Sequence, residues 1–401
     1  MKVEQSVLSQ RVLHLAESET LKMARMGREL RALGHDVISL SLGEPDFDTP
    51  AHIKEAAYQA LCDGYTKYTP VAGLPELTKA VSEKFKRDNN LEYKPDEIVV
   101  SNGAKQSIYN ICQALLDPGD EVVVFAPYWV SYWEIVKLSG GVPVPVYAGV
   151  EREFKPTPQQ LEAAITPRTK FVLFSSPCNP TGTVFDRQEL QAYAEVLARH
   201  EHVIVVSDEI YEYINFTHEH VSIGSFPQVK GRTVTVNGFA KGFAMTGWRL
   251  GYIGAPKFIA DACAKIQGQV TSGAASFSQK AGAFALTADL GPTRAMREAF
   301  RERRDIVLSM LEEIPGIKAN HPEGAFYVFP DVSAFFGKTD GHNVIRNADD
   351  FCDYIMSSAY VGLVSGAAFG DPNCFRLSYA ASEEQLREAI NRVKTVLSRL
   401  R

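Results

Sequence analysis

The sequence lacks the features that mark membrane, secreted and nucleic-acid-binding proteins. No apolar run approaches the length of a transmembrane helix, and the N-terminal Met1-Lys-Val-Glu-Gln5 has no signal-peptide core. The net charge is -6, and no basic stripe runs along the chain. This charge pattern argues against nucleic acid or an anionic membrane surface as a partner. There is no internal repeat and no low-complexity segment.

Paired cysteines and clustered metal ligands are also missing. The six cysteines are scattered, and no two form a C-x-x-C motif. This pattern is typical of reduced, buried thiols and predicts a cytoplasmic protein. The H-x-H pairs His200/His202 and His218/His220 have no clustered acids or cysteines nearby. We therefore interpret these histidines as surface residues and expect no metal site.

What the chain does contain is typical of a large α/β protein. Its 401 residues are too many for one small core, so we expect two domains or one large α/β domain with an appendage. From residue 97 the pattern strand, glycine-containing loop, helix repeats. The strands predicted there are 97–100, 121–125, 142–147, 171–174 and 203–206. From residue 256 the pattern becomes mostly helical, and short strands return near 325–329 and 374–379.

One lysine lies in surroundings that favour chemistry. Lys241 follows a strand-like run and is surrounded by glycines and small apolar residues, with no acid within several positions. Desolvation lowers the pKa of a lysine and makes its amine a competent Schiff-base nucleophile. Arg249, eight residues on, has the planar fork that holds a phosphate. Together they suggest pyridoxal 5'-phosphate; the alternative is a buried strand edge with two cations that reach the solvent.

Two further charged residues lie in or directly after apolar strands. Asp208 follows the buried run 203–206, where an unpaired acid is costly. Ligands of open α/β sheets bind outside the carboxyl ends of strands, so Asp208 and Lys241 are candidates for one site. Arg376 lies within an apolar strand and needs an anion, either a bound ligand or a core acid in a salt bridge.

Several loop residues give weaker signals. Gly43 permits close approach of the backbone to a ligand, or is simply a turn glycine. The small residues of 101–106 begin a helix whose free N–H groups favour an anion, although the motif is not a Walker A loop. Asn179 can present its amide to a ligand or cap a turn.

Taken together, the motifs resemble the class I aminotransferases of pyridoxal-phosphate fold type I, in particular the bacterial aspartate aminotransferases. They occur in the family order and cover almost the whole chain. The matching segments are 39–47 (SLSLGEPDF), 67–76 (KYTPVAGLPE), 179–182 (NPTG), 207–211 (SDEIY), 240–249 (AKGFAMTGWR) and 375–379 (FRLSY).

The resemblance implies a role for each matching residue around the cofactor. Lys241 corresponds to the lysine that forms the Schiff base and moves the proton. Asp208 corresponds to the acid that pairs with the pyridine nitrogen. Tyr211 and Asn179 correspond to the hydrogen-bond partners of the ring oxygen, and Trp129 to the aromatic residue that stacks on the ring.

For the phosphate, the resemblance implies Arg249 and the backbone of Gly103 and Ala104. Many relatives carry serine where this chain has Gly238 and Ala240, so one hydroxyl of the phosphate site is missing here. This difference puts the phosphate affinity in doubt and leaves the chemistry unchanged.

For the substrate, the resemblance implies that Arg376 binds the α-carboxylate, with the Gly43 backbone beside it. Lys105, helped by the hydroxyl of Thr20, corresponds to the residue that contacts the distal carboxylate of an acidic substrate. A lysine is a flexible point charge, so discrimination by Lys105 is expected to be looser than by a second arginine. The side chains expected to line the substrate site as well are Trp129 and Asn179.

The fold implied is a large domain with a mostly parallel sheet flanked by helices, plus a smaller α+β domain. We expect an N-terminal segment over 1–48 that packs with the small domain, a cofactor-binding domain over 49–300, and a small domain over 301–401. Tyr68 corresponds to a tyrosine that reaches the phosphate in the neighbouring subunit, which implies a homodimer with active sites at the interface.

The activity implied is transfer of an amino group between aspartate or glutamate and a 2-oxo acid, 2-oxoglutarate or oxaloacetate, by a ping-pong mechanism. The alternatives within this fold are an aromatic or prephenate aminotransferase, or a lyase. A different class, the pyridoxal-phosphate-sensing regulatory module, needs an attached DNA-binding segment. The first predicted helices run straight into the Gly43 loop and leave no room for one.

Overall fold

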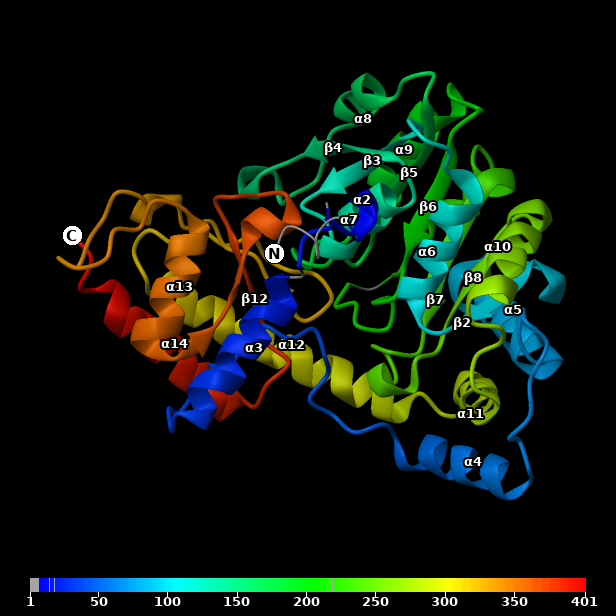
Figure 1. Cartoon of the computed structure of the whole chain (residues 1–401), viewed down its shortest axis with the longest axis horizontal. Helices are drawn as coiled ribbons and strands as arrows, with labels where there is room; N and C mark the ends of the chain where they lie inside the picture. Colours follow the sequence, from blue (N-terminus) through cyan, green and yellow to red (C-terminus); the bar gives the residue numbers. More distant parts are fainter. Residues whose placement is uncertain (1–6, 14, 18, 218) are drawn as a thin grey trace.

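The computed structural model of the chain describes residues 7–13, 15–17, 19–217 and 219–401. A larger part is built around a seven-stranded sheet, and a smaller part lies at the left of Figure 1 with the C-terminus. The cavity described below lies between these two parts.

The large sheet has the strand order β2-β8-β7-β6-β5-β3-β4. Its pairs are parallel except those that β8 makes with β2 and β7, which confirms the predicted mostly parallel sheet. Strands β3 and β7 are buried along their whole length, as expected where helices cover both faces. The strands are β2 (Ile98–Ser101), β3 (Glu121–Ala126), β4 (Val142–Tyr147), β5 (Thr169–Ser175), β6 (Ile204–Asp208), β7 (Thr233–Gly238) and β8 (Gly251–Gly254).

Helices cover the sheet on both faces. Ile108 of α6 and Ile259 of α10 belong to the hydrophobic cluster on one face, and Leu190 of α9 belongs to the cluster on the other. Helix α4 packs on α11 and lies farther from the sheet (Figure 1). The helices are α4 (Ala51–Cys62), α5 (Pro75–Asn89), α6 (Ala104–Leu115), α7 (Val130–Leu138), α8 (Pro158–Ala164), α9 (Arg187–Ala198), α10 (Lys257–Val270) and α11 (Ser276–Thr287).

The smaller part contains the three-stranded sheet β11-β12-β9 and the helices that pack on it. The N-terminal segment joins it, because Ile38 of β1 pairs with Val361 of β10 in a parallel bridge. The elements are α3 (Glu19–Ala32), β1 (Ile38–Ser39), β9 (Tyr327–Val328), α13 (Ala348–Ala359), β10 (Val361–Gly362), β11 (Val364–Ser365), β12 (Phe375–Ser378) and α14 (Glu383–Leu397), whereas the short helix α2 (Gln10–Leu13) lies over the large part beside α7 in Figure 1.

One long helix, α12 (Gly291–Glu312), connects the two parts. It follows α11 after a break at the predicted Gly291-Pro292, where proline occupies the first turn. The chain therefore crosses between the parts within a continuous helix, and the boundary expected at residue 300 stays a prediction.

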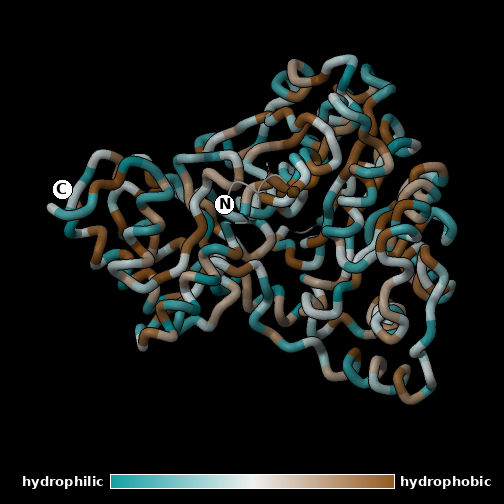
Figure 2. Tube along the Cα trace, in the orientation of Figure 1, coloured by the Kyte–Doolittle hydropathy of each residue, from teal (hydrophilic) through white to brown (hydrophobic). Residues whose placement is uncertain are grey.

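The helices are amphipathic rather than uniformly apolar. Hydrophobic and hydrophilic residues alternate along them (Figure 2). Among the residues that the structure describes, no helix combines the length and hydropathy that crossing a membrane requires. All six cysteines are free thiols; five are buried as expected, whereas Cys62 at the end of α4 is exposed.

Candidate active site

A cavity of about 450 Å³ opens at the carboxyl ends of the parallel strands. The loops that follow β3, β5, β6 and β7 form its floor, and residues of β9, β12 and α3 close it from the smaller part. The structure thereby brings most of the predicted residues to one place, while their roles stay predictions. Those lining the cavity are Thr20, Gly43, Gly103, Ala104, Lys105, Trp129, Asn179, Asp208, Tyr211, Lys241, Arg249 and Arg376.

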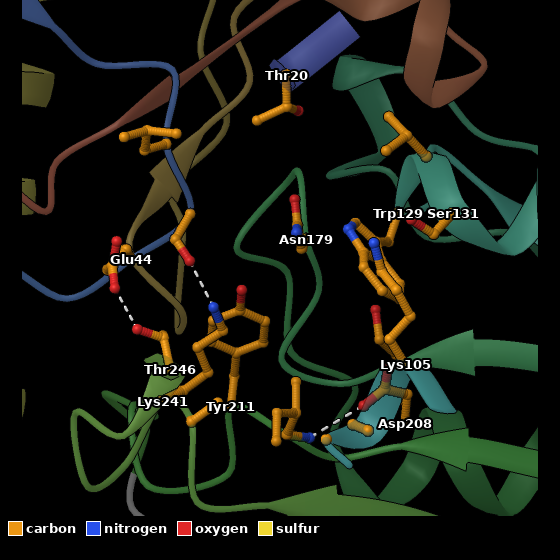
Figure 3. A pocket seen from close by; sticks show the side chains of 18 of the residues that line it. Thr20, Glu44, Lys105, Trp129, Ser131, Asn179, Asp208, Tyr211, Lys241 and Thr246 are labelled. Carbon is orange, nitrogen blue, oxygen red and sulfur yellow. Dashed lines mark hydrogen bonds between the residues drawn. The ribbon is translucent and has the colours of Figure 1, made fainter. Parts of the chain in front are cut away.

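Lys241 lies in the loop directly after β7 and points into the cavity (Figure 3). Its Nζ donates a hydrogen bond to the carbonyl oxygen of Gly43. Burial, together with the positive charge of Arg376, lowers the pKa of Lys241 to about 8. About a tenth of this amine is therefore uncharged at pH 7, far more than for an ordinary lysine, and a nucleophilic lysine reacts in this uncharged form.

Asp208 ends β6 at the bottom of the cavity and is 4% exposed. The hydroxyl of Tyr132 donates to its Oδ2 at 2.6 Å, and the N–H of Ile210 donates to its Oδ1 at 3.1 Å. Burial raises the pKa of Asp208 to about 6, and these two hydrogen bonds limit the rise. A carboxylate held in this way is suited to pair with a cation that enters the cavity.

Gly103 and Arg249 form an anion-binding corner at the start of α6. Gly103 has φ of +86° and precedes Ala104, the first residue of the helix, so the free N–H groups of the first turn face the cavity. A Cβ at Gly103 would lie 2.5 Å from Nη2 of Arg249, so only glycine lets the guanidinium come this close. Arg249 donates to the carbonyls of Thr246 and Asn102, and no carboxylate of the described chain pairs with it.

The missing serine at residue 238 has a steric reason. A Cβ on Gly238 would lie 2.8 Å from the Cα of Gly251 and 3.0 Å from the carbonyl oxygen of Leu250. Strand β8 approaches β7 too closely here for any side chain. Ala240 lines the cavity without supplying a hydroxyl.

Arg376 lies on β12 and is 2% exposed. Its Nη1 donates to Oδ1 of Asn179 at 2.9 Å and its Nη2 to the carbonyl oxygen of Ser41 at 2.6 Å, while Nε has no partner. No acid of the described residues forms an ion pair with it, which excludes the alternative of a core salt bridge within this part of the chain. A buried guanidinium with a free N–H and no counter-ion favours an anion in the cavity.

Lys105 and Trp129 form the wall opposite Lys241 (Figure 3). The Lys105 Nζ lies 5.0 Å from the centre of the Trp129 ring. Partial burial and the charge of Arg249 lower the pKa of Lys105. Thr20, on α3, lies at the far end of the cavity, and no hydrogen bond in the described structure joins it to Lys105.

Tyr68 is the predicted residue that the structure does not bring to the cavity. Its side chain is 98% exposed and lies outside the lining of this chain's own site. The tyrosine therefore contributes to an active site only if another subunit brings one to it.

The prediction that the H-x-H histidines are surface residues is wrong for His220. Its side chain is 11% exposed, and its Nε2 lies 2.9 Å from Oε2 of Glu209. Glu209 follows Asp208 in the chain and is buried. Its carboxylate contacts His220 and accepts a hydrogen bond from Ser222, because a buried carboxylate must be paired. His218 lies outside the described residues.

Sequence reasoning missed two tyrosines of the site. Tyr132 contacts Asp208, and the hydroxyl of Tyr327 lies 2.8 Å from that of Tyr211. Tyr132 comes three residues after Trp129 in the first turn of α7, and this short spacing was the only signal in the sequence. Tyr327 sits in an apolar strand, where a tyrosine looks like an ordinary core residue.

Comparison with known proteins identifies close relatives. The family model described as Aminotransferase class I and II matches residues 35–393. The bifunctional aspartate aminotransferase and glutamate/aspartate-prephenate aminotransferase of Petunia hybrida is 47% identical, over 99% of this chain and 84% of the relative. The aspartate aminotransferase from Rhizobium meliloti has a similar structure, with a TM-score of 0.95 at 43% identity over 98% of this chain and 99% of that one. The aspartate aminotransferase from Thermus thermophilus with maleate has a TM-score of 0.91 at 44% identity, over 97% and 99%.

Proposed function

This chain belongs to the family of class I and II aminotransferases, and we propose that it moves amino groups between aspartate or glutamate and the 2-oxo acids oxaloacetate and 2-oxoglutarate. As a member of this family it is a pyridoxal 5'-phosphate-dependent enzyme that acts on amino acids and 2-oxo acids. Support for the acidic substrates comes from the relatives named aspartate aminotransferases and from the cations of the cavity.

The residues present fit the cofactor. The glycine-opened corner at Gly103, with Arg249 beside it, is a cradle for a phosphate. Asp208 lies in the floor of the same cavity, where it can face the ring nitrogen. Lys241 has the lowered pKa of a carbonyl-reactive amine. When bound, the cofactor supplies an electron sink for the electrons released at the substrate Cα.

Each residue around the ring has a distinct task in the proposal. Asp208 stays ionised beside the ring nitrogen and stabilises its proton. Tyr211 and Asn179 would donate hydrogen bonds to the ring oxygen, and Trp129 would pack against the ring face. With the cofactor and substrate bound, the Lys241 amine would take the proton from the substrate Cα as general base and return it as general acid.

The observation that best supports the proposal is that Arg376 has no acidic partner among the described residues. Its guanidinium is buried at the cavity wall with a free Nε and no acid partner among the described residues. A substrate α-carboxylate satisfies this group and is fixed by it, which orients the Cα–H bond to the ring. The Gly43 backbone, Lys105 and Thr20 line the same cavity, and in the proposal Gly43 lies beside the α-carboxylate while Lys105 and Thr20 contact a second carboxylate.

The active enzyme is proposed to be a homodimer. Tyr68 is almost fully exposed, although it belongs to a segment shared with the family. In a dimer its hydroxyl would reach the phosphate bound by the other subunit. The six free thiols support the proposed cytoplasmic location, where thiols stay reduced.

The test mixes the pyridoxal-phosphate form with a panel of amino acids and follows the absorbance of the bound cofactor in a single turnover. Aspartate and glutamate should convert it fastest, and a neutral amino acid such as alanine slowly. Equal rates for acidic and neutral amino acids would contradict the substrate assignment but not the aminotransferase activity. No conversion by any amino acid would contradict the activity itself.

Prephenate is a second candidate acceptor, because the Petunia relative is named for it as well. The Trp129 wall beside Lys105 offers an apolar surface and a cation to a carboxylated ring. The amino form of the enzyme, mixed with prephenate or with oxaloacetate, measures this directly. A rate with prephenate within about tenfold of the oxaloacetate rate would support a dual specificity.

A further inference from the structure

Tyr327 lies where the two parts of the chain meet in the cavity. It belongs to β9 of the small sheet, is fully buried, and lines the active-site cavity. Its partner Tyr211 lies just beyond β6 of the large sheet. The contact between the two hydroxyls, at 2.8 Å, therefore joins the two sheets at the catalytic centre.

The ring of Tyr327 supports a second site residue. The Cζ of Arg376 lies 4.6 Å from the centre of this ring, within the range of a cation–π contact. The two residues are near neighbours in the small sheet, because Tyr327 pairs with Ser378 on the strand that carries Arg376. On the other side, the hydroxyl of Tyr327 lies against the backbone of Gly43 and leaves no room for a side chain there.

Either hydroxyl is able to donate in this contact, and the two arrangements differ in which hydrogen remains for the cavity. A tyrosine hydroxyl has one hydrogen to donate. If Tyr211 gives its hydrogen to Tyr327, none is left for a ligand in the cavity. If Tyr327 donates, Tyr211 keeps its hydrogen for the cavity and, as an acceptor, becomes a stronger donor itself.

We propose that Tyr327 is a positioning residue: its hydroxyl donates to Tyr211 and thereby directs the Tyr211 hydrogen to the cofactor ring oxygen, while its ring supports Arg376 in the orientation that binds the substrate carboxylate. One side chain then aligns the cofactor contact and the substrate contact. This inference rests on the proposed aminotransferase function and adds a residue to it.

Charged groups surround the pair of hydroxyls. The charged groups that face the two hydroxyls are Arg376 on β12, Lys241 after β7 and Asp208 at the end of β6. Burial raises the pKa of both tyrosines, so each keeps its hydrogen at neutral pH. The Arg376 charge acts on both and lowers their pKa, which makes the hydroxyls better donors.

The first test removes only the hydroxyl, in Tyr327→Phe, and measures the pH midpoint of the absorbance change of the bound cofactor. Without the Tyr327 hydroxyl, Tyr211 is a weaker hydrogen-bond donor, and the ring oxygen of the cofactor becomes more basic. The titrating proton next to this oxygen is then lost at a higher pH. The midpoint should rise by about half to one pH unit, which corresponds to the net free energy of one hydrogen bond. Tyr379→Phe removes a hydroxyl from another buried tyrosine, outside the cavity lining, and should leave the midpoint unchanged.

A double variant shows whether Tyr327 acts through Tyr211. In a Tyr211→Phe background, Tyr327→Phe should cause no further shift of the midpoint, because the group it orients is gone. A shift equal to that in the parent background would overturn the proposed route. The proposed route would also be overturned if the Tyr327→Phe enzyme had the same pH midpoint as the parent.

The second test removes the ring, in Tyr327→Leu, and measures binding of maleate, a dicarboxylate that does not react, by its effect on the cofactor absorbance. Maleate should bind about three- to thirtyfold more weakly than to the parent, whereas Tyr327→Phe should bind it nearly as the parent does. Equal maleate affinity in all three proteins would overturn the support of Arg376. A parent protein that neither binds the cofactor nor changes absorbance with pH would instead overturn the proposed function.

Discussion

Replacing Lys105 by alanine tests how the cavity selects an acidic side chain. Lys105 starts close to the anion-binding corner, and its ammonium lies over Trp129 in the lining of the cavity that also contains Arg376. A substrate whose α-carboxylate is on Arg376 would place a second carboxylate near Lys105. Lys105→Ala should therefore lower kcat/KM for aspartate and leave alanine nearly unaffected.

The size of the effect follows from the exposure of the lysine. A hydrogen bond to a charged group is worth about 1.5–3 kcal/mol, and access of solvent to Lys105 reduces this to roughly 1–2 kcal/mol. The expected fall in kcat/KM for aspartate is then about five- to thirtyfold. Steady-state kinetics on aspartate and alanine measure it, and Lys257→Ala, an exposed lysine that begins α10, is the control.

The pH dependence adds a second test of the same lysine. The pKa of Lys105 is lowered from the ordinary value of 10.5, so its positive charge is present below that lowered pKa and is lost as pH rises through it. The preference for aspartate over alanine should decline at a lower pH than an unperturbed lysine would give. An equal fall of both substrates in Lys105→Ala would refute this reasoning, since Lys105 would then support the cofactor instead of the substrate side chain.

Three further predictions concern the other charged groups of the site. Borohydride reduction of the cofactor-loaded enzyme followed by peptide mapping should label Lys241, and label on Lys105 or Lys265 would contradict the assignment. Arg376→Leu should raise KM for every amino acid, because all carry the α-carboxylate; an effect on one substrate alone would mean that Arg376 contacts the side chain. Asp208 has a folded-state pKa of about 6, above its unfolded value of about 3.9, so its contribution to stability is greatest below pH 4 and is lost as pH rises through 6. Asp208→Asn should thus raise the free energy of unfolding of the cofactor-free protein, measured in urea, by about 2–3 kcal/mol at pH 7.5, with little gain at pH 4. Transamination by the same variant should fall sharply. A variant with parental stability and turnover would argue against both effects.

Much of the fold could be predicted because it depends on local patterns. Apolar runs bounded by glycine-containing loops marked five strands of the large sheet, β2 to β6, and the family resemblance implied its mostly parallel order, whereas the antiparallel β8 was not predicted. The same patterns placed Asp208 and Lys241 after neighbouring strands, and the pairing of β6 with β7 brings the two residues to one edge. The motifs carried the family resemblance, which the family model over residues 35–393 confirms.

Other features could not be predicted, since they depend on partners far away in the chain. Tyr132 and Asp208 are 76 positions apart, and Tyr211 and Tyr327 are 116 apart. Tyr211 was predicted from its motif, whereas nothing in the local sequence distinguishes Tyr327 from a core aromatic residue, and only the spacing from Trp129 marks Tyr132. His220 was misplaced for a similar reason, because its burial is set by the carboxylate of Glu209 on another element.

The sequence by itself determined which chemical groups the protein has and in what order its strands and helices occur, since backbone periodicity and residue type are local properties. Only the tertiary structure decided the protonation of those groups and which of them have no partner. Arg376 is a strand residue in the sequence, and the fold alone leaves it buried with a free Nε and no acid partner among the described residues. Lys241 is an ordinary lysine until burial and the charge of Arg376 bring its pKa to about 8. Desolvation and long-range charge act through space, so they exist only once the chain has folded.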